Sequence, residues 1–262
     1  MRTTFASTAV DVALGGGDAG AIGRIGLFLD VDGTLLDLAA RPDEVVVPPG
    51  LISDLVAAER RTGGALALVS GRPIAEIDRL FAPFRPKAAG VHGAELRFDP
   101  DDGAIALEAS PLPEAVWTDL NVLVSGFPGT FVENKRFSFT VHYRQAPDAE
   151  PALRRRLVEF LETLPYPGII MLKAHHAFEL KAAAFDKGRA IAAFLERAPF
   201  RGQTPMFVGD DDTDEAGFAA VAAAGGRAYA VGRVRPGAVG LFESPAAVRA
   251  WLAAFADGAR PA

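Results

Sequence analysis

The sequence contains no cysteine among its 262 residues, which excludes disulfide bridges and thiolate metal sites and fits a cytoplasmic protein. It has no apolar segment long enough to span a bilayer, and residues 1–24 lack the charged-then-apolar pattern of a signal peptide. Positive charge is not in excess either. The formal net charge of -6 argues against nucleic acid or an anionic membrane as a partner.

From residue 25 onward, short apolar runs alternate with segments of helical periodicity. The pattern predicts strands at 25–31, 65–69, 87–91, 205–208 and 227–231, and helices at 49–61, 73–81, 186–197, 213–224 and 245–255. Such alternation predicts an α/β fold with a Rossmann-like parallel sheet and helices on both faces. Residues 1–24 are rich in small residues, and we expect them to form a loose N-terminal extension.

The middle of the chain follows a different pattern, because a helix and two alternating strands are predicted twice. The first unit is a helix at 114–124 followed by "GTFVENKRFSFTVHYR"; the second is "ALRRRLVEFLETL" followed by "GIIMLKAHHAFELKA". We therefore predict a second α/β domain at 111–183, inserted into a core domain formed by 25–110 and 184–262. The alternative, a disordered insertion, is disfavoured by the strong alternation.

Acidic residues occur at the ends of two predicted strands. Asp30 and Asp32 end the first, and "GDDDTDE", with Asp210, Asp211 and Asp214, follows another. Two carboxylates about 4 Å apart repel by roughly 4 kcal/mol at an effective dielectric near 20, and a divalent cation would remove that penalty. Ligand sets made only of oxygen favour magnesium over zinc. The alternative for each cluster alone is a solvated acidic turn that caps a helix.

Two other segments contain groups that bind anions, in contrast to the acidic residues at the strand ends. Ser70 and Gly71 lie between a strand and a helix, where a hydroxyl and backbone amides bind anions, although a simple Ser N-cap would look the same. Lys187 lies in the first turn of a helix, where its charge opposes the helix dipole, although a lone lysine is usually a surface residue. Together these groups predict a phosphate site in which Asp30 attacks phosphorus and Asp32 acts as acid and base.

Four short motifs, "DVDGT", "SGR", the lysine of "DKG" and "GDDDTDE", resemble in this order the motifs of the haloacid dehalogenase superfamily of phosphatases. The inserted domain resembles the larger α/β cap of that superfamily. More specifically, "GVHGAELR", "ENKRFSFTVHYR" and "GDDDTDE" are similar to the trehalose-6-phosphate phosphatase family. The resemblance covers nearly the whole chain after residue 24. The segment "KAAAFDKG" departs from it, because it lacks a proline common just after the cap glutamate.

This resemblance implies roles for individual residues. Asp30 would be the nucleophile, Asp32 the acid and base, and Ser70 with Gly71 and Lys187 would hold the phosphate. Magnesium would be bound by Asp30, Asp210 and the backbone carbonyl of Asp32, while Asp211 and Asp214 support the metal site or the lysine. The cap residues expected to recognise sugar hydroxyls are Glu133, Lys135, His142, Arg144 and Glu179. A surface charge for Arg144 and a satisfied core histidine for His142 are the alternatives.

The expected function is hydrolysis of trehalose 6-phosphate by a magnesium-dependent phosphatase, through an aspartyl-phosphate intermediate. Another sugar phosphate, such as sucrose phosphate, is the near alternative. A phosphomutase and a non-catalytic phospho-acceptor are more distant ones, and the second is disfavoured by Asp32 and by the cap. The resemblance also suggests a functional link to a trehalose-phosphate synthase.

Overall fold

The computed structural model describes residues 25–39, 44–101, 105–106, 110–174 and 176–258. The N-terminal extension expected at 1–24 lies outside them. The chain divides into two compact units: one comprises the residues up to Ile105 and those from Asp186 onward, and the other is Ala106–Phe185. We call them the core unit and the cap unit. Within the described residues, none of the helices combines the length and apolarity that crossing a membrane requires.

The core unit is built on an eight-stranded sheet with the order β12-β11-β10-β1-β2-β3-β4-β5. Its strands are β1 (Ile25–Leu29), β2 (Leu66–Val69), β3 (Lys87–Gly90), β4 (Glu95–Arg97), β5 (Ile105–Ala106), β10 (Thr204–Gly209), β11 (Arg227–Val231) and β12 (Gly240–Phe242). Neighbouring strands from β12 to β3 are parallel, whereas β4 runs antiparallel to β3. The prediction of a mainly parallel core sheet is confirmed.

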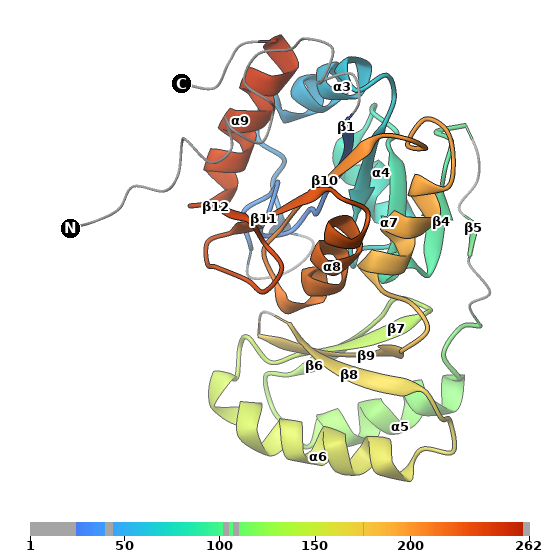
Figure 1. Cartoon of the computed structure of the whole chain (residues 1–262). Helices are drawn as coiled ribbons and strands as arrows, with labels where there is room; N and C mark the ends of the chain where they lie inside the picture. The colour runs from blue at the N-terminus through green and yellow to red at the C-terminus, as the bar shows by residue number, and fades with distance from the viewer. Residues whose placement is uncertain (1–24, 40–43, 102–104, 107–109, 175, 259–262) are drawn as a thin grey trace. The chain divides into compact units, whose positions relative to one another are not determined.

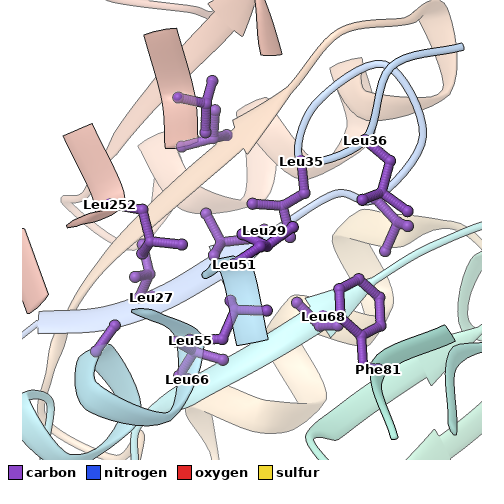
Figure 2. Packing of buried hydrophobic residues seen from close by; sticks show 14 of the residues in the cluster. Leu27, Leu29, Leu35, Leu36, Leu51, Leu55, Leu66, Leu68, Phe81 and Leu252 are labelled. Carbon is purple, nitrogen blue, oxygen red and sulfur yellow. The ribbon is translucent and has the colours of Figure 1, made fainter. Parts of the chain in front are cut away.

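Helices cover both faces of this sheet. They are α3 (Leu51–Arg61), α4 (Ile74–Phe81), α7 (Lys187–Leu195), α8 (Glu215–Ala223) and α9 (Pro245–Asp257). On one face, Leu27 and Leu29 of β1 join a buried cluster with residues of α3, α4 and α9 (Figure 2). On the other face, the Phe28 ring stacks on Phe200 and lies 6.0 Å from that of Phe194 in α7. Because successive side chains of a strand point to opposite faces, a fully apolar β1 requires both layers.

The register of the central strands brings the two acidic segments together. Leu29 of β1 pairs with Val208 of β10. Beyond this pair, the backbone N–H of Asp30 donates to the carbonyl of Val208 at 3.0 Å. The residues that follow β1 and β10 therefore leave the sheet side by side at its carboxyl edge, where ligands bind in open α/β sheets.

The cap unit has its own four-stranded antiparallel sheet, in the order β6-β7-β9-β8. The strands are β6 (Phe131–Asn134), β7 (Ser138–His142), β8 (Ile169–Ala174) and β9 (Ala177–Ala182), and the helices are α5 (Glu114–Ser125) and α6 (Glu150–Thr163). Both helices lie on the same face of the sheet (Figure 1) and share a buried apolar cluster with it. The predicted repeat of helix, strand and strand is confirmed.

Candidate active site

The centre of the core site is a buried lysine between two carboxylates. Lys187 is the first residue of α7, and its Nζ donates to Asp30 Oδ1 at 2.7 Å and to Asp214 Oδ1 at 2.6 Å. Lys187 is 2% exposed and Asp214 is fully buried. The two carboxylates offset both the desolvation of the ammonium and its unfavourable position at a helix N-terminus. The sequence-predicted Asp30 and Lys187 are therefore in direct contact.

The protonation of this group follows from its burial and its neighbours. Burial opposes the charge of Lys187, but Asp214 and Asp30 outweigh it and hold the pKa of Lys187 well above its usual value. For Asp30 the balance is reversed: burial, together with repulsion from Asp211 and Asp32, raises its pKa although Lys187 acts to lower it. The two carboxylates carry more negative charge than the one ammonium balances.

A third carboxylate, that of Asp210, makes the excess of negative charge larger. Asp30, Asp210 and Asp214 each offer an oxygen atom, and these atoms lie within 4.8 Å of one another. Burial, followed by repulsion from Asp30, Asp211 and Asp214, raises the pKa of Asp210 to about 9. A divalent cation would relieve this repulsion, and a set of carboxylate oxygens suits Mg²⁺. The donor set therefore fits a magnesium ion.

The three carboxylates are not equally available to an ion. Asp214 already has both oxygens engaged, because Oδ1 accepts from Lys187 and Oδ2 accepts from the backbone N–H groups of Asp210 at 2.9 Å and Asp211 at 3.0 Å. Asp30 and Asp210 are accordingly better placed to bind a metal. Asp214 instead ties the acidic loop to Lys187.

The turn after β1 is shaped to fit this loop. Gly33 has φ 81°, a conformation that glycine adopts at little cost. A Cβ atom at Gly33 would overlap the carboxylate of Asp210, so the close approach of the two segments also requires glycine. Next to it, Thr34 Oγ1 donates to Asp210 Oδ1 at 3.4 Å.

Asp32 is not one of the three clustered carboxylates; it forms a bidentate ion pair with Arg72, a residue to which sequence reasoning gave no role. Arg72 Nε donates to Asp32 Oδ2 at 2.6 Å, and Arg72 Nη2 donates to Asp32 Oδ1 at 2.8 Å. The guanidinium is buried, and its Nη1 donates to Glu76 Oε2 at 2.9 Å. Such a fork fixes the plane of a carboxylate. The signal was present in "SGR", where arginine directly follows the predicted Ser70 and Gly71.

The loop after β2 contains Ser70 and Gly71, and it contacts a second overlooked residue, His92, which lies in the turn after β3. Ser70 is buried, and its Oγ accepts from the backbone N–H of Arg72 at 3.1 Å, so the hydroxyl proton can be donated elsewhere. A Cβ atom at Gly71 would lie 2.6 Å from His92 Nε2, which explains why glycine is needed beside Ser70. His92 belongs to the "GVHGAELR" segment, and its backbone N–H donates to the Ser70 carbonyl at 2.9 Å.

The acidic loop after β10 is braced by contacts of its own. Asp211 Oδ1 accepts from the backbone N–H of Thr213 at 2.8 Å and from its hydroxyl at 2.6 Å. Arg235 is buried; its Nε donates to the Asp210 carbonyl at 2.9 Å, and its Nη1 pairs with Asp212. Arg235, which sequence reasoning also missed, therefore balances part of the charge of this loop.

Three of the expected cap residues share one face of the cap sheet. Glu133 of β6 forms a hydrogen bond with His142 of β7, with 2.8 Å between Oε2 and Nε2. Glu179 of β9 is buried. Burial acts to raise the pKa of Glu133, but the hydrogen bond with His142 and the charge of Lys135, in the turn after β6, outweigh it and lower this pKa. Arg144 follows β7 and is half-buried. The structure thus groups Glu133, His142 and Glu179.

Comparisons with known proteins show which family the chain resembles. The family model described as Trehalose-phosphatase matches residues 28–235. The chain is 40% identical over 209 residues to the trehalose-6-phosphate phosphatase of Escherichia coli (strain K12), covering 78% of this chain and 76% of that protein. It is 39% identical over 232 residues to a probable trehalose-phosphate phosphatase of Sinorhizobium fredii (strain NBRC 101917 / NGR234), covering 88% and 87% of the two chains.

Solved structures share the fold. A trehalose-6-phosphate phosphatase related protein superposes with a TM-score of 0.73 at 25% identity, over 89% of this chain and 97% of the other. The C-terminal domain of the Candida albicans trehalose-6-phosphate phosphatase superposes with a TM-score of 0.83 at 18% identity, over 98% and 99% of the two chains. The second likeness supports the fold alone.

Proposed function

Because the chain belongs to the trehalose-phosphatase family and is therefore a phosphoric monoester hydrolase, we propose that it hydrolyses trehalose 6-phosphate through an aspartyl-phosphate on Asp30, with Mg²⁺ as cofactor. The observation that carries the mechanism is the contact of Asp30 with the buried Lys187, beside the carboxylate of Asp210. This contact supplies a nucleophile and a cation at the edge of the sheet where ligands bind.

In the first step, a carboxylate oxygen of Asp30 attacks the phosphorus atom and the bond from phosphorus to the sugar oxygen breaks. Asp32 gives its proton to the leaving alcohol. In the second step, Asp32 removes a proton from water, the water oxygen attacks the same phosphorus, and the bond to Asp30 breaks. The products are trehalose and inorganic phosphate, and both aspartates return to their initial state.

The remaining core residues would bind the phosphate group and the metal ion or hold the catalytic groups in place. Lys187 and the Ser70 hydroxyl would bind phosphate oxygens, with the backbone at Gly71 beside them. Asp30, Asp210 and the backbone carbonyl of Asp32 would hold Mg²⁺, which supplies positive charge to the phosphate oxygens. Arg72 would hold the ionised form of Asp32 in a fixed plane, and Asp32 would leave this pair and take up a proton before it acts as the acid of the first step. Asp211 and Asp214 would keep the acidic loop and Lys187 in place.

The cap unit would recognise the sugar. Glu133, His142 and Glu179 share a face, with Lys135 and Arg144 near the ends of the same strands, and such groups bind hydroxyls by charge-assisted hydrogen bonds. A functional link to a trehalose-phosphate synthase and a cytoplasmic location remain predictions.

A panel of sugar phosphates tests the substrate. The protein is incubated with trehalose 6-phosphate, sucrose 6-phosphate and glucose 6-phosphate, with magnesium or with a chelator, and released phosphate is measured. We expect the highest kcat/KM for trehalose 6-phosphate, and no release in chelator. Faster phosphate release from sucrose 6-phosphate would show that sucrose 6-phosphate, and not trehalose 6-phosphate, is the preferred substrate. Formation of an isomerised sugar phosphate without free phosphate would indicate a mutase.

A further inference from the structure

One face of the cap sheet carries no helix of the cap unit among the described residues, because α5 and α6 both lie on the opposite face (Figure 1). We call it the helix-free face. Side chains of a strand alternate between the two faces. In β7, Phe139 and Val141 pack in the apolar cluster with the helices, so Ser138, Thr140 and His142 point to the helix-free face.

Thr140 lies at the middle of this face. The strand register pairs it with Glu133 on β6 and with Glu179 on β9. Directly paired residues of neighbouring strands point to the same side, so the three side chains form a row with the hydroxyl between two carboxylates. This row contains two of the residues to which the proposed function gives sugar recognition, but the threonine between them has had no role.

The hydroxyl of Thr140 has no hydrogen-bond partner in the part of the chain that the structure describes. Thr140 is 4% exposed, and its Oγ1 is buried without a hydrogen-bond partner among the described residues. Ser138 Oγ, one position along the same face, is in the same condition. Buried hydroxyls are normally hydrogen-bonded, and a valine would fill the space of Thr140 with no unsatisfied group. An orphaned hydroxyl in such a place is explained by a ligand that completes it.

The chemistry of the row indicates what kind of ligand fits. Carboxylates only accept hydrogen bonds, whereas a threonine hydroxyl both donates and accepts, as a sugar hydroxyl does. A sugar hydroxyl can therefore donate to Glu133 or Glu179 and accept from Thr140 at the same time. A ligand with several adjacent hydroxyl groups satisfies the row, and an aryl group does not.

We propose that Thr140 is a specificity-determining residue, whose hydroxyl forms a hydrogen bond with a hydroxyl of the sugar between Glu133 and Glu179. This inference rests on the proposed function, because it names a further residue for the same substrate. It predicts opposite effects on stability and on sugar recognition when the hydroxyl is removed. If the hydroxyl had a structural role, its removal would lower stability and sugar recognition together.

The experiment compares Thr140→Val, Thr140→Ser and the wild type, with trehalose 6-phosphate and 4-nitrophenyl phosphate as substrates. In Thr140→Val, the ratio of kcat/KM for the sugar ester to kcat/KM for the aryl ester should fall about three- to tenfold, the effect of one lost neutral hydrogen bond. Thr140→Ser keeps the hydroxyl and should retain most of the ratio. The Tm of unliganded Thr140→Val should equal or exceed that of the wild type, because an orphaned polar group is removed.

Thr130 provides a matched control within the cap unit, since its Oγ1 donates to the Phe127 carbonyl at 2.7 Å. Thr130→Val should lower the Tm and leave the substrate ratio unchanged. An unchanged ratio in Thr140→Val, or a lowered ratio that Thr140→Ser does not rescue, would overturn the inference.

The wild type separates this inference from the proposed function. If it prefers another sugar phosphate, the proposed substrate is wrong, and the same ratio measured with that sugar phosphate decides the role of Thr140. If it prefers no sugar phosphate over the aryl ester, both proposals fail.

Discussion

At the scale of single residues, the core site is governed by one ammonium among several buried carboxylates. Lys187 neutralises part of the charge of Asp30 and Asp214, but Asp210 is left with a pKa raised to about 9, through burial and the repulsion of its acidic neighbours. An acid whose pKa is higher in the folded protein than in the unfolded chain binds an extra proton when folded. The stability that this proton confers is lost as the pH rises.

The metal-free protein should therefore become less stable as the pH is raised from about 4 to about 9, between the unfolded and folded pKa values of Asp210. Magnesium should raise the Tm most at the upper end of this range, where the carboxylates are ionised. Thermal unfolding in chelator and in magnesium, at several pH values, measures both effects. Asp210→Asn should flatten the slope; an equal slope in that variant would show that Asp210 is not its source.

Arg72 should matter for the proposed role of Asp32 as acid and base. Arg72→Lys keeps the charge but loses the bidentate contact with Asp32, so we expect kcat/KM for trehalose 6-phosphate to fall roughly tenfold or more because Asp32 is misplaced. The loss should be smaller for 4-nitrophenyl phosphate, because nitrophenolate leaves without a proton. Arg156→Lys, at an exposed position on α6, is the control. Equal losses for both esters would argue against a role through Asp32.

The residues that sequence reasoning singled out in the core were those whose chemistry is unusual for their position: aspartates at strand ends and a lysine at a helix start. The structure brings Asp30, Lys187, Asp210 and Asp214 together. Arg72 and Arg235 were missed, because an arginine in a loop looks like a surface charge until its partner is known. Thr140 was missed for a similar reason, since a threonine is an ordinary residue in a strand.

At the scale of elements, a buried arginine links α4 to the edge of the core sheet. Arg97 of β4 is fully buried, and its guanidinium donates to Asp78 of α4 at 2.6 and 2.8 Å and to the Pro86 carbonyl. Burial opposes ionisation of Asp78, but hydrogen bonds and charge from Arg97 outweigh it and lower the pKa of Asp78. This contribution to stability is present above the usual pKa of an aspartate and is lost as the pH falls below it.

Asp78→Ala should destabilise the protein by about 3–5 kcal/mol, because it leaves the charge of Arg97 buried without its carboxylate. Arg97→Met should be less damaging, since it removes the charge and keeps most of the packing volume. Urea unfolding of both variants and of the double variant measures the difference. A larger loss for Arg97→Met than for Asp78→Ala would contradict this account.

Most helices and strands could be predicted from the period of the apolar residues in the sequence, and the elements that were missed are short. The two helix-strand-strand repeats were predicted because Phe139, Val141, Phe178 and Leu180 alternate with polar residues, and these four belong to the buried apolar cluster of the cap unit. Strand β12 was missed because its three residues are too few to show a period. The 3-10 turn at Val91–Gly93 was missed because its conformation depends on tertiary contacts, with His92 at φ 54°.

At the scale of the whole molecule, chemistry and recognition are assigned to different units of the chain. The core unit contains the proposed nucleophile, the proposed acid and base, and the carboxylates that could hold a metal ion, and the cap unit contains the row of Glu133, Thr140 and Glu179. Changes to Asp30, Lys187 or Asp210 should affect all phosphate esters alike, whereas changes on the helix-free face should affect sugar esters most. This division of roles depends first on the identity of the nucleophile.

The most direct test is to identify the residue that carries the phosphoryl group. In Asp32→Asn, a good leaving group should still be displaced, but water would not be activated, so the covalent intermediate should accumulate. The variant is mixed with 4-nitrophenyl phosphate and magnesium, quenched in acid and digested, and the peptides are analysed by mass spectrometry. We predict one phosphoryl group on Asp30, absent when magnesium is chelated. A phosphoryl group on another residue, or release of nitrophenol with Asp30 never modified, would contradict the account.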